Sequence, residues 1–159
     1  MTAPRLSIIV PVYNEQESVS ALADEIAAVA QNHALDCEVI WTDDGSSDSS
    51  YREITAACRK YTYMRGIRFG RNCGQTAALS AGFDSAEGRL VVTMDADLQN
   101  DPEDIPMMIA KLNEGYDIVS GWRDKRKDPL FSKKIPSFVA NRIIARMTGV
   151  NIHDFGCTL

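Results

Sequence analysis

The 159-residue sequence predicts an α/β fold, a three-layer αβα sandwich around a mainly parallel central sheet. Three observations support this prediction. Short apolar runs alternate along the chain with segments of helical periodicity, which is the order that builds parallel βαβ units. The apolar runs are continuous, and this is typical of strands buried on both faces. A polar cluster follows each run, at the strand end where parallel α/β sheets bind ligands.

The first two strands and helices are predicted from the first third of the chain. The apolar run LSIIVPVY, residues 6–13, predicts the first strand. Residues 15–33 carry apolar side chains at helical spacing and acids in the first turns, so we expect a helix there. CEVIWTDDGSSDSS predicts a second strand that ends in acids and a Gly-Ser turn. Residues 48–60 are expected to form the second helix.

The next elements continue the same alternation. MRGIRF predicts the third strand, and GRNCGQTAALSAGFDSAEG predicts a glycine-containing loop that enters an alanine-rich helix. RLVVTMD predicts the fourth strand. Residues 102–114 are expected to form a helix that begins at Pro102, because proline fits the first helical turn. YDIVSGW, residues 116–122, predicts a fifth strand.

The C-terminal part is predicted to be a charged loop, RDKRKDPLFSKK, and a basic helix, IPSFVANRIIARMTG, that Gly149 ends. No internal repeat or linker divides the sequence, so we expect residues 1–159 to form a single domain. The chain stops at DFGCTL without a cap or a charged tail, and we expect the natural protein to continue beyond it.

Composition argues against several classes of function. The net charge is −5, from 17 basic and 22 acidic residues, whereas domains that bind nucleic acid are usually strongly basic. The four cysteines form no C-x-x-C pair, which argues against a zinc site and a disulfide framework and favours reduced thiols in a cytosolic protein. Neither a membrane-spanning apolar run nor a secretory signal is recognisable. Acids concentrate at residues 84–117 and bases at residues 123–146, which suggests two different partners.

The segment VVTMDADLQNDPEDIP carries two aspartates, Asp95 and Asp97, at the end of the fourth predicted strand. Residues two apart in an extended segment point the same way, so both carboxylates can face one divalent cation. Hard oxygen ligands select Mg²⁺ or Mn²⁺, which usually bridge to substrate phosphates, and Gln99 can add a third oxygen. The alternative is that these acids cap the helix near Pro102. The common phosphate motifs, a P-loop and a G-x-G-x-x-G after the first strand, do not occur.

The segment DDGSSD has a similar ambiguity. Its serines and Asp48 are ordinary helix-capping residues, and Gly45 is an ordinary turn residue. Asp43 and Asp44 can instead accept hydrogen bonds from a base N–H or a sugar hydroxyl. Both interpretations stay open for this segment.

Three further features each have a functional and a structural interpretation. Arg123 can bind a diphosphate or form a surface ion pair. The RNCGQ loop places Arg71, Asn72 and Gly74 beside the site, or simply caps a helix. Helix 135–147 is basic and amphipathic, and it can rest on an anionic membrane or pack on the core of the protein.

The motifs taken together resemble those of the family-2 inverting glycosyltransferases, which have the Rossmann-like GT-A fold. The segments are PVYNE, DDGSSD, RNCGQTAALSAG, DADLQNDPEDIP, GYDIVSGWR and DFGC, in this order and across almost the whole chain. Within that family the sequence is most similar to the polyprenyl-phosphate glycosyltransferases, among them the dolichyl-phosphate mannose synthases. DADLQ and the basic helix after GWR carry this closer resemblance.

The resemblance implies metal-dependent transfer of a sugar from a UDP- or GDP-sugar to a polyprenyl (undecaprenyl or dolichyl) phosphate, at the cytoplasmic face of a membrane. The residues implied for the sugar nucleotide are Pro11, Tyr13, Glu15, Asp43, Asp44, Arg71, Gly74 and Ala96. Those implied for catalysis are Asp95, Asp97 and Arg123, and those for Mg²⁺ or Mn²⁺ are Asp95, Asp97 and Gln99. Lys133 and Ser137 are implied for the acceptor phosphate, and helix 135–147 for the membrane surface.

Two rival functions remain open at this point. The chain can transfer a sugar to a soluble or cell-envelope glycan, or it can be a non-catalytic module that binds a sugar nucleotide. A nucleotidyltransferase is a weaker alternative, because the usual glycine-rich loop after the first strand is missing. Trp41 departs from the family pattern, in which a small aliphatic residue precedes the two aspartates, and we expect it to alter the base pocket.

Overall fold

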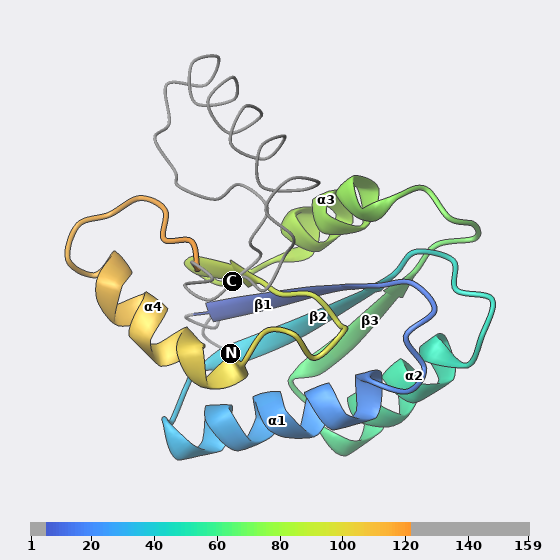
Figure 1. Ribbon diagram of the computed structural model, residues 1–159, viewed down its shortest axis with the longest axis horizontal. Helices are drawn as coiled ribbons and strands as arrows, with labels where there is room; N and C mark the ends of the chain where they lie inside the picture. The colour runs from blue at the N-terminus through green and yellow to red at the C-terminus, as the bar shows by residue number, and fades with distance from the viewer. Residues whose placement is uncertain (1–5, 122–159) are drawn as a thin grey trace, which may run out of the picture. The chain divides into compact units, whose positions relative to one another are not determined.

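The computed structural model describes residues 6–121 (Figure 1). Among these, residues 6–107 belong to one compact unit and residues 108–121 to a second. The elements of the first unit are β1 (Leu6–Val12), α1 (Val19–Asn32), β2 (Cys37–Asp43), α2 (Ser50–Lys60), β3 (Met64–Arg68), α3 (Gln75–Ser85), β4 (Leu90–Thr93) and η1 (Pro102–Asp104). Helix α4 (Ile105–Leu112) begins in this unit and ends in the second.

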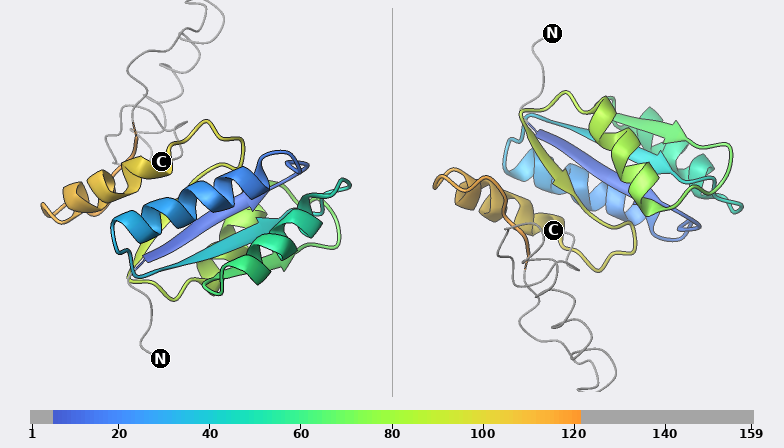
Figure 2. Two further views of the ribbon diagram at one scale, coloured as in Figure 1. Left: turned by 90° about the horizontal axis from the view of Figure 1, so that it is seen from below. Right: turned by 90° about the horizontal axis from the view of Figure 1, so that it is seen from above.

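The described strands form one parallel sheet in the order β3-β2-β1-β4. Leu6 of β1 pairs with Cys37 on one side and with Leu90 on the other. Helices α1 and α2 cover one face of this sheet and α3 covers the other (Figures 1 and 2). This arrangement confirms the predicted αβα layers. Both faces of β1 are buried, with Ile8, Ile9 and Val10 fully excluded from solvent, as its continuous apolar sequence predicts.

Trp41 fits into β2 because a glycine lies beside it. Its side chain is fully buried, and its register partner on β3 is Gly66. A Cβ atom at Gly66 would lie 2.9 Å from Ile54 Cγ2 of α2, so this face has no room for a second side chain there. Since paired residues in neighbouring strands share a face, Trp41 packs on the α2 side of the sheet.

Two predicted helices begin differently from the sequence-based expectation. Helix α1 begins at Val19 and not at Glu15: residues 16–18 form a turn, in which the Glu15 carbonyl accepts from the Ser18 amide at 3.2 Å. The helix expected at residues 102–114 begins as the 3₁₀ turn η1, and the α-helical part ends at Leu112. Asp101 caps η1, since its Oδ1 accepts from the Glu103 amide at 3.0 Å.

The prediction of a fifth strand at residues 116–122 is wrong over the part that the structure describes. Residues 116–121 form no strand, and Tyr116 and Ile118 are 54% and 65% exposed. A strand forms only where its backbone can make hydrogen bonds to a neighbouring strand, and the pattern YDIVSGW carries no information about such a partner. Within the second unit, Lys111 instead pairs with Glu114 at 2.7 Å and lies over the Tyr116 ring.

A buried polar network joins the first three strands to the segment before β4. The Glu38 carboxylate accepts from Ser7 Oγ at 2.6 Å, from the Glu87 amide at 2.7 Å and from Arg65 Nε at 3.0 Å. Ser7 Oγ in turn accepts from the Gly88 amide at 2.8 Å. Burial opposes ionisation of Glu38, but the hydrogen bonds from Ser7, Glu87 and Arg65 outweigh it and lower the pKa of this carboxyl.

Replacing Glu38 by glutamine tests this network. The lowered pKa means that Glu38 stabilises the fold fully above the ordinary carboxyl value of about 4.3. This stabilisation is lost as the pH falls through the folded-state pKa. We therefore expect Glu38→Gln to lower the free energy of unfolding by about 1–3 kcal/mol at neutral pH. We also expect the free energy of unfolding of this variant to fall less steeply than that of the wild type as the pH is lowered. Urea unfolding of both proteins across the acid range measures the effect, and parallel pH profiles would contradict it.

Candidate functional site

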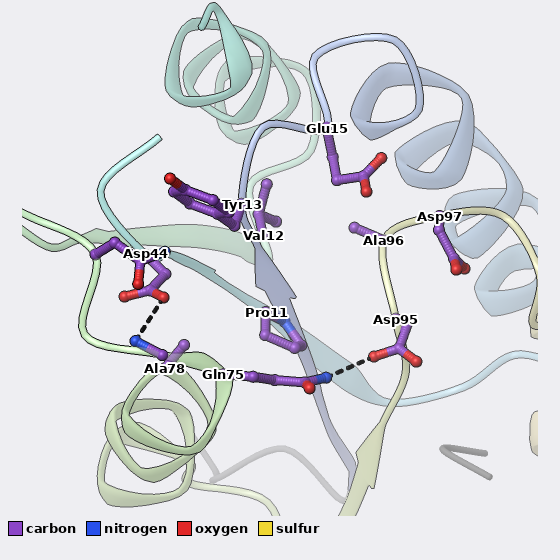
Figure 3. Close-up of a pocket in the computed structure, with 12 residues that line it drawn as sticks. Pro11, Val12, Tyr13, Glu15, Asp44, Gln75, Ala78, Asp95, Ala96 and Asp97 are labelled. Atoms are coloured by element: carbon purple, nitrogen blue, oxygen red, sulfur yellow. Dashed lines mark hydrogen bonds between the residues drawn. The ribbon is translucent and has the colours of Figure 1, made fainter. Parts of the chain in front are cut away.

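A cavity of about 320 Å³ opens where β1, β2 and β4 end and α3 begins (Figure 3). Its volume lies within the usual range of small-molecule sites, about 300–1,000 Å³. The position follows the rule that parallel α/β sheets bind ligands beyond the carboxyl ends of their strands. The residues that line it are Pro11, Val12, Tyr13, Glu15, Asp44, Asn72, Gly74, Gln75, Ala78, Asp95, Ala96 and Asp97.

Asp44 holds the loop that leads into α3. Its side chain is 3% exposed, and its two oxygens accept from the Cys73 and Gly74 amides at 2.7 and 2.8 Å. Gly74 has a φ of +93°, which only glycine adopts readily. Gly45, which follows Asp44, allows the loop after β2 to approach the loop before α3. A Cβ atom at Gly45 would lie only 2.4 Å from the Arg71 carbonyl carbon.

Asp43, the last residue of β2, faces the opposite way from Asp44, since side chains alternate along an extended segment. It is fully buried, and its Oδ1 accepts from the Ser46 amide at 3.1 Å. Its Oδ2 lies 3.4 Å from Arg68 Nε, an ion pair without the geometry of a hydrogen bond. The Arg68 guanidinium stacks over the Tyr51 ring of α2 at 4.7 Å. Asp43 therefore supports the α2 side of the sheet and does not line the cavity.

The turn after β4 presents Asp95 and Asp97 to the cavity. The Asp95 amide donates to Asn100 Oδ1 at 3.3 Å, and Asp97 Oδ1 accepts from the Gln99 amide at 3.0 Å. Gln75 Nε2 donates to Asp95 Oδ1 at 2.9 Å, as Figure 3 shows. The prediction that a strand aligns the two carboxylates is not met, because β4 ends at Thr93 and a turn places them.

The donor chemistry of this turn suits a hard divalent cation. Two carboxylates on one turn match the way that Mg²⁺ is usually held, by one or two acids together with substrate phosphates. Within residues 6–121, no group of three or more His, Cys, Asp and Glu side chains is placed to hold a metal ion. Asp95 and Asp97, which both line the cavity, are residues that could hold such a cation.

The loop after β1 is bound to the loop after β2 by hydrogen bonds in both directions, and we call residues 14–16 and 46–50 the paired loops. The amides of Asn14, Glu15 and Gln16 donate to Ser46 Oγ, Ser50 Oγ and Asp48 Oδ2 at 2.9, 2.8 and 3.2 Å. In return, the amides of Ser47 and Ser49 donate to Asn14 Oδ1 and Gln16 Oε1 at 2.9 and 3.0 Å. The paired loops fix the backbone on which the cavity residues Tyr13 and Glu15 stand.

The serines of residues 46–50, of which DDGSSD contains Ser46 and Ser47, therefore have a different role from the helix capping that their sequence suggests. Ser49 is the N-cap of α2, and its side chain makes no capping hydrogen bond. Asp48 does act locally, because its Oδ1 accepts from both the amide and the hydroxyl of Ser50. Ser46 and Ser50 bind the loop after β1 instead.

The sequence model for glycosyl transferase family 2 matches residues 7–159, nearly the whole chain. The chain belongs to glycosyl transferase family 2. Dodecaprenyl-phosphate galacturonate synthase from Rhizobium johnstonii is 47% identical to it over 97% of this chain and 46% of that protein. Undecaprenyl-phosphate 4-deoxy-4-formamido-L-arabinose transferase from Yersinia pestis is 44% identical to it, over 98% of this chain and 47% of that protein. The chain thus spans about half the length of these curated relatives.

Solved structures of other glycosyltransferases share the fold of this family-2 chain. Glucosyl-3-phosphoglycerate synthase from Mycobacterium tuberculosis, in complex with phosphoglyceric acid, matches with a TM-score of 0.70 and 19% identity over 98% of this chain and 55% of that one. The mannosyltransferase PcManGT from Pyrobaculum calidifontis, in complex with GDP-Man and Mn²⁺, matches with a TM-score of 0.63 and 23% identity. The match covers 76% of this chain and 35% of that one. At these identities the likeness establishes the GT-A fold and nothing more.

The cavity brings together most of the site residues that the family-2 motifs predict. The predicted residues that line it are Pro11, Tyr13, Glu15, Asp44, Gly74, Asp95, Ala96 and Asp97. Three predicted residues, Asp43, Arg71 and Gln99, are not among the lining residues. Arg123, Lys133, Ser137 and helix 135–147 lie outside the described residues.

Sequence reasoning missed Val12, Gln75 and Ala78 as lining residues, while Asn72 was already singled out by its motif. Val12 and Ala78 carry no chemical signal that distinguishes them from core residues. Gln75 had one available signal, because it directly follows Gly74 at the start of a helix that enters at the ligand-binding edge of the sheet. No helix within residues 6–121 is both long enough and apolar enough to span a bilayer.

Proposed function

We propose that this chain is the catalytic domain, residues 1–159, of a glycosyltransferase that moves a sugar from a UDP- or GDP-sugar to a polyprenyl phosphate. The proposal rests on one observation: the motif residues of three strand ends line the same cavity. These residues are Tyr13, Asp44, Asp95 and Asp97. Two family-2 relatives at 47% and 44% identity support the acceptor class, because both are named for polyprenyl phosphates.

Tyr13, Glu15 and Asp44 would hold the nucleoside of the donor. The Tyr13 side chain is 48% exposed at the cavity, so its ring is accessible for stacking against a base. Both Asp44 oxygens already accept from backbone amides, but each carboxylate oxygen can accept a second hydrogen bond. A base N–H or a ribose hydroxyl would supply it. Ala96 lies between the two aspartates in the cavity lining, and its small side chain would lie beside the diphosphate.

Asp95 and Asp97 would hold Mg²⁺ or Mn²⁺, with Gln99 and Arg123 as further proposed contacts. When bound, such an ion neutralises the charge of the leaving diphosphate. Gln99 would have to turn inward to take part, because it does not line the cavity. The Mn²⁺ and GDP-Man in the PcManGT complex support the general chemistry of the fold, though the likeness to that protein is one of fold.

The acceptor phosphate would attack the anomeric carbon directly. A phosphate is already anionic, so the reaction needs no strong general base from the protein. The described residues would contribute by orienting the donor and by placing charge where the diphosphate departs. Lys133 and Ser137 are the proposed contacts of the acceptor phosphate. The helix expected at residues 135–147 is the proposed contact with the cytoplasmic face of the membrane.

A donor and acceptor screen tests this proposal. Thermal melting is measured with a panel of UDP- and GDP-sugars, each with Mg²⁺ or Mn²⁺. One donor class is expected to stabilise the protein by about 2.7 kcal/mol at a concentration of about 100 Kd. Transfer of the matching labelled sugar to undecaprenyl phosphate is then compared with transfer to soluble glycans.

Product on undecaprenyl phosphate alone is the expected result of the screen. Product on soluble glycans alone would replace the proposed acceptor. Donor binding with neither transfer nor donor hydrolysis would identify a non-catalytic binding module. A panel in which no donor raises the melting temperature would contradict the sugar-nucleotide site itself.

A further inference from the structure

We propose that Gln75 is a positioning residue, which holds the Asp95 carboxylate in the orientation needed to bind a divalent cation. The inference rests on the proposed function, because it assumes that Asp95 is a metal ligand. Gln75 belongs to α3 and Asp95 to the turn after β4, and their side chains meet at the cavity wall through the 2.9 Å bond from Nε2 to Oδ1. Figure 3 shows Gln75 extending from the start of α3 toward Asp95.

The backbone of Gln75 is anchored by a buried group. Gln75 directly follows Gly74, and the Gly74 amide donates to the buried Asp44 carboxylate at 2.8 Å. The carbonyl of Gly74 accepts from the amides of Ala77 and Ala78 at 3.0 and 3.2 Å, which starts the helix. The residue directly before Gln75 is therefore held at both its amide and its carbonyl, and this sets the point from which the Gln75 side chain extends.

Asp95 is likewise held at its backbone, because its amide donates to Asn100 Oδ1 at 3.3 Å. Its side chain stands on a turn and not on a strand, so neighbours in a sheet do not define its orientation. The hydrogen bond from Gln75 restricts the remaining rotation of the carboxylate. Asp44, Gly74, Gln75 and Asp95 thus form a continuous connection between the ends of β2 and β4 along the cavity wall.

The chemistry of an amide suits this role. A carboxylate has about four acceptor sites on its two oxygens, so it can accept from an amide and ligate a cation together. The Gln75 amide carries no charge, and it orients the acid without competing with the cation as a lysine would. Groups that hydrogen-bond a metal ligand typically contribute about 10–100-fold to metal affinity or activity.

The test is a Mn²⁺ titration of the protein, with free Mn²⁺ measured by electron paramagnetic resonance at saturating UDP and, separately, GDP. Gln75→Met keeps the length of the side chain and removes the donor. Gln31→Met is the matched control, because Gln31 lies on α1 and outside this cavity lining. Gln75→Asn is a second variant, which keeps the amide but is one methylene too short to reach Asp95.

We expect both Gln75 variants to raise the Kd for Mn²⁺ about tenfold or more. Their melting temperatures should stay close to that of the wild type, and Gln31→Met should match the wild type in both measurements. In transfer assays, saturating Mn²⁺ should recover most of the lost kcat, which a merely structural defect would not allow.

Three results would overturn the inference. The first is an unchanged Mn²⁺ Kd in both Gln75 variants when the wild type binds Mn²⁺, and this leaves the proposed function intact. The second is an equal loss of affinity in Gln31→Met, which would mean a general effect of the substitution. The third is a wild type that binds no Mn²⁺ with either nucleotide, and this would remove the metal step of the proposed function as well.

Discussion

Replacing Asp95 by asparagine is expected to slow sugar transfer about 100-fold or more, the usual cost of losing a preorganised electrostatic group in an active site. Asparagine keeps the shape of the side chain and one oxygen that can accept from Gln75. It removes the negative charge that a divalent cation requires. Because Asp95 stands in a turn at the cavity wall, the variant should fold normally, and the loss should appear in kcat and in Mn²⁺ affinity.

Asp101→Asn is the matched control for this experiment. Asp101 lies a few residues further along, caps η1 and does not line the cavity. Asparagine caps helices about as well as aspartate does, so this variant should keep both its stability and its activity. Initial rates at saturating Mn²⁺ and donor provide the comparison. A rate for Asp95→Asn within a few-fold of the wild type would remove Asp95 from the proposed metal site.

Replacing Asp44 by alanine is expected to cause a large loss of stability. The substitution leaves the Cys73 and Gly74 amides without their acceptor beside a side-chain position that is 3% exposed. A buried donor left unsatisfied costs about 1–3 kcal/mol, and for these two partly buried amides the lower half of that range gives an expected total of about 2–4 kcal/mol. The loop before α3 should loosen, and donor binding should weaken with it, because Gly74 and Gln75 line the same cavity.

Urea unfolding of the wild type, Asp44→Ala and Asp84→Ala measures this effect. Asp84 is exposed on α3, so the same substitution there should change the free energy of unfolding by less than about 0.5 kcal/mol. Limited proteolysis of the segment around Cys73 adds a local measurement, with faster cleavage expected in Asp44→Ala alone. A loss below about 1 kcal/mol in Asp44→Ala would mean that water replaces the carboxylate as the acceptor.

The parts of the fold that depend on local pattern could be predicted from the sequence. The first four strands and the helices between them are marked by continuous apolar runs, helical spacing and turn residues, and these signals act over a few residues. The start of α1 could not be predicted, because the turn at residues 16–18 belongs to a segment whose amides, those of Glu15 and Gln16, bind side chains more than 30 residues away. The fifth strand failed for a similar reason, since an apolar pattern says nothing about the presence of a partner.

The candidate site divides in the same way. Its location follows from the rule for parallel sheets, and Asp95 and Asp97 follow from their position after an apolar run. The alternation of side chains could have separated Asp43 from Asp44 without any structure, since consecutive residues of an extended segment face opposite ways. The bond from Gln75 to Asp95 joins two elements across 20 residues of sequence, and no local pattern indicates it.

The paired loops have a consequence for how this sequence can diverge. Amides of each loop donate to side chains of the other, so the two segments are matched residue by residue, as two strands in a ladder are. An inserted or deleted residue in either segment would shift all of these donors away from their acceptors at once. Substitutions in the paired loops that keep an acceptor side chain are tolerable, whereas insertions and deletions that change the length of a loop are not. Evolutionary variation in loop length should therefore fall elsewhere, in connections whose amides bind within their own segment.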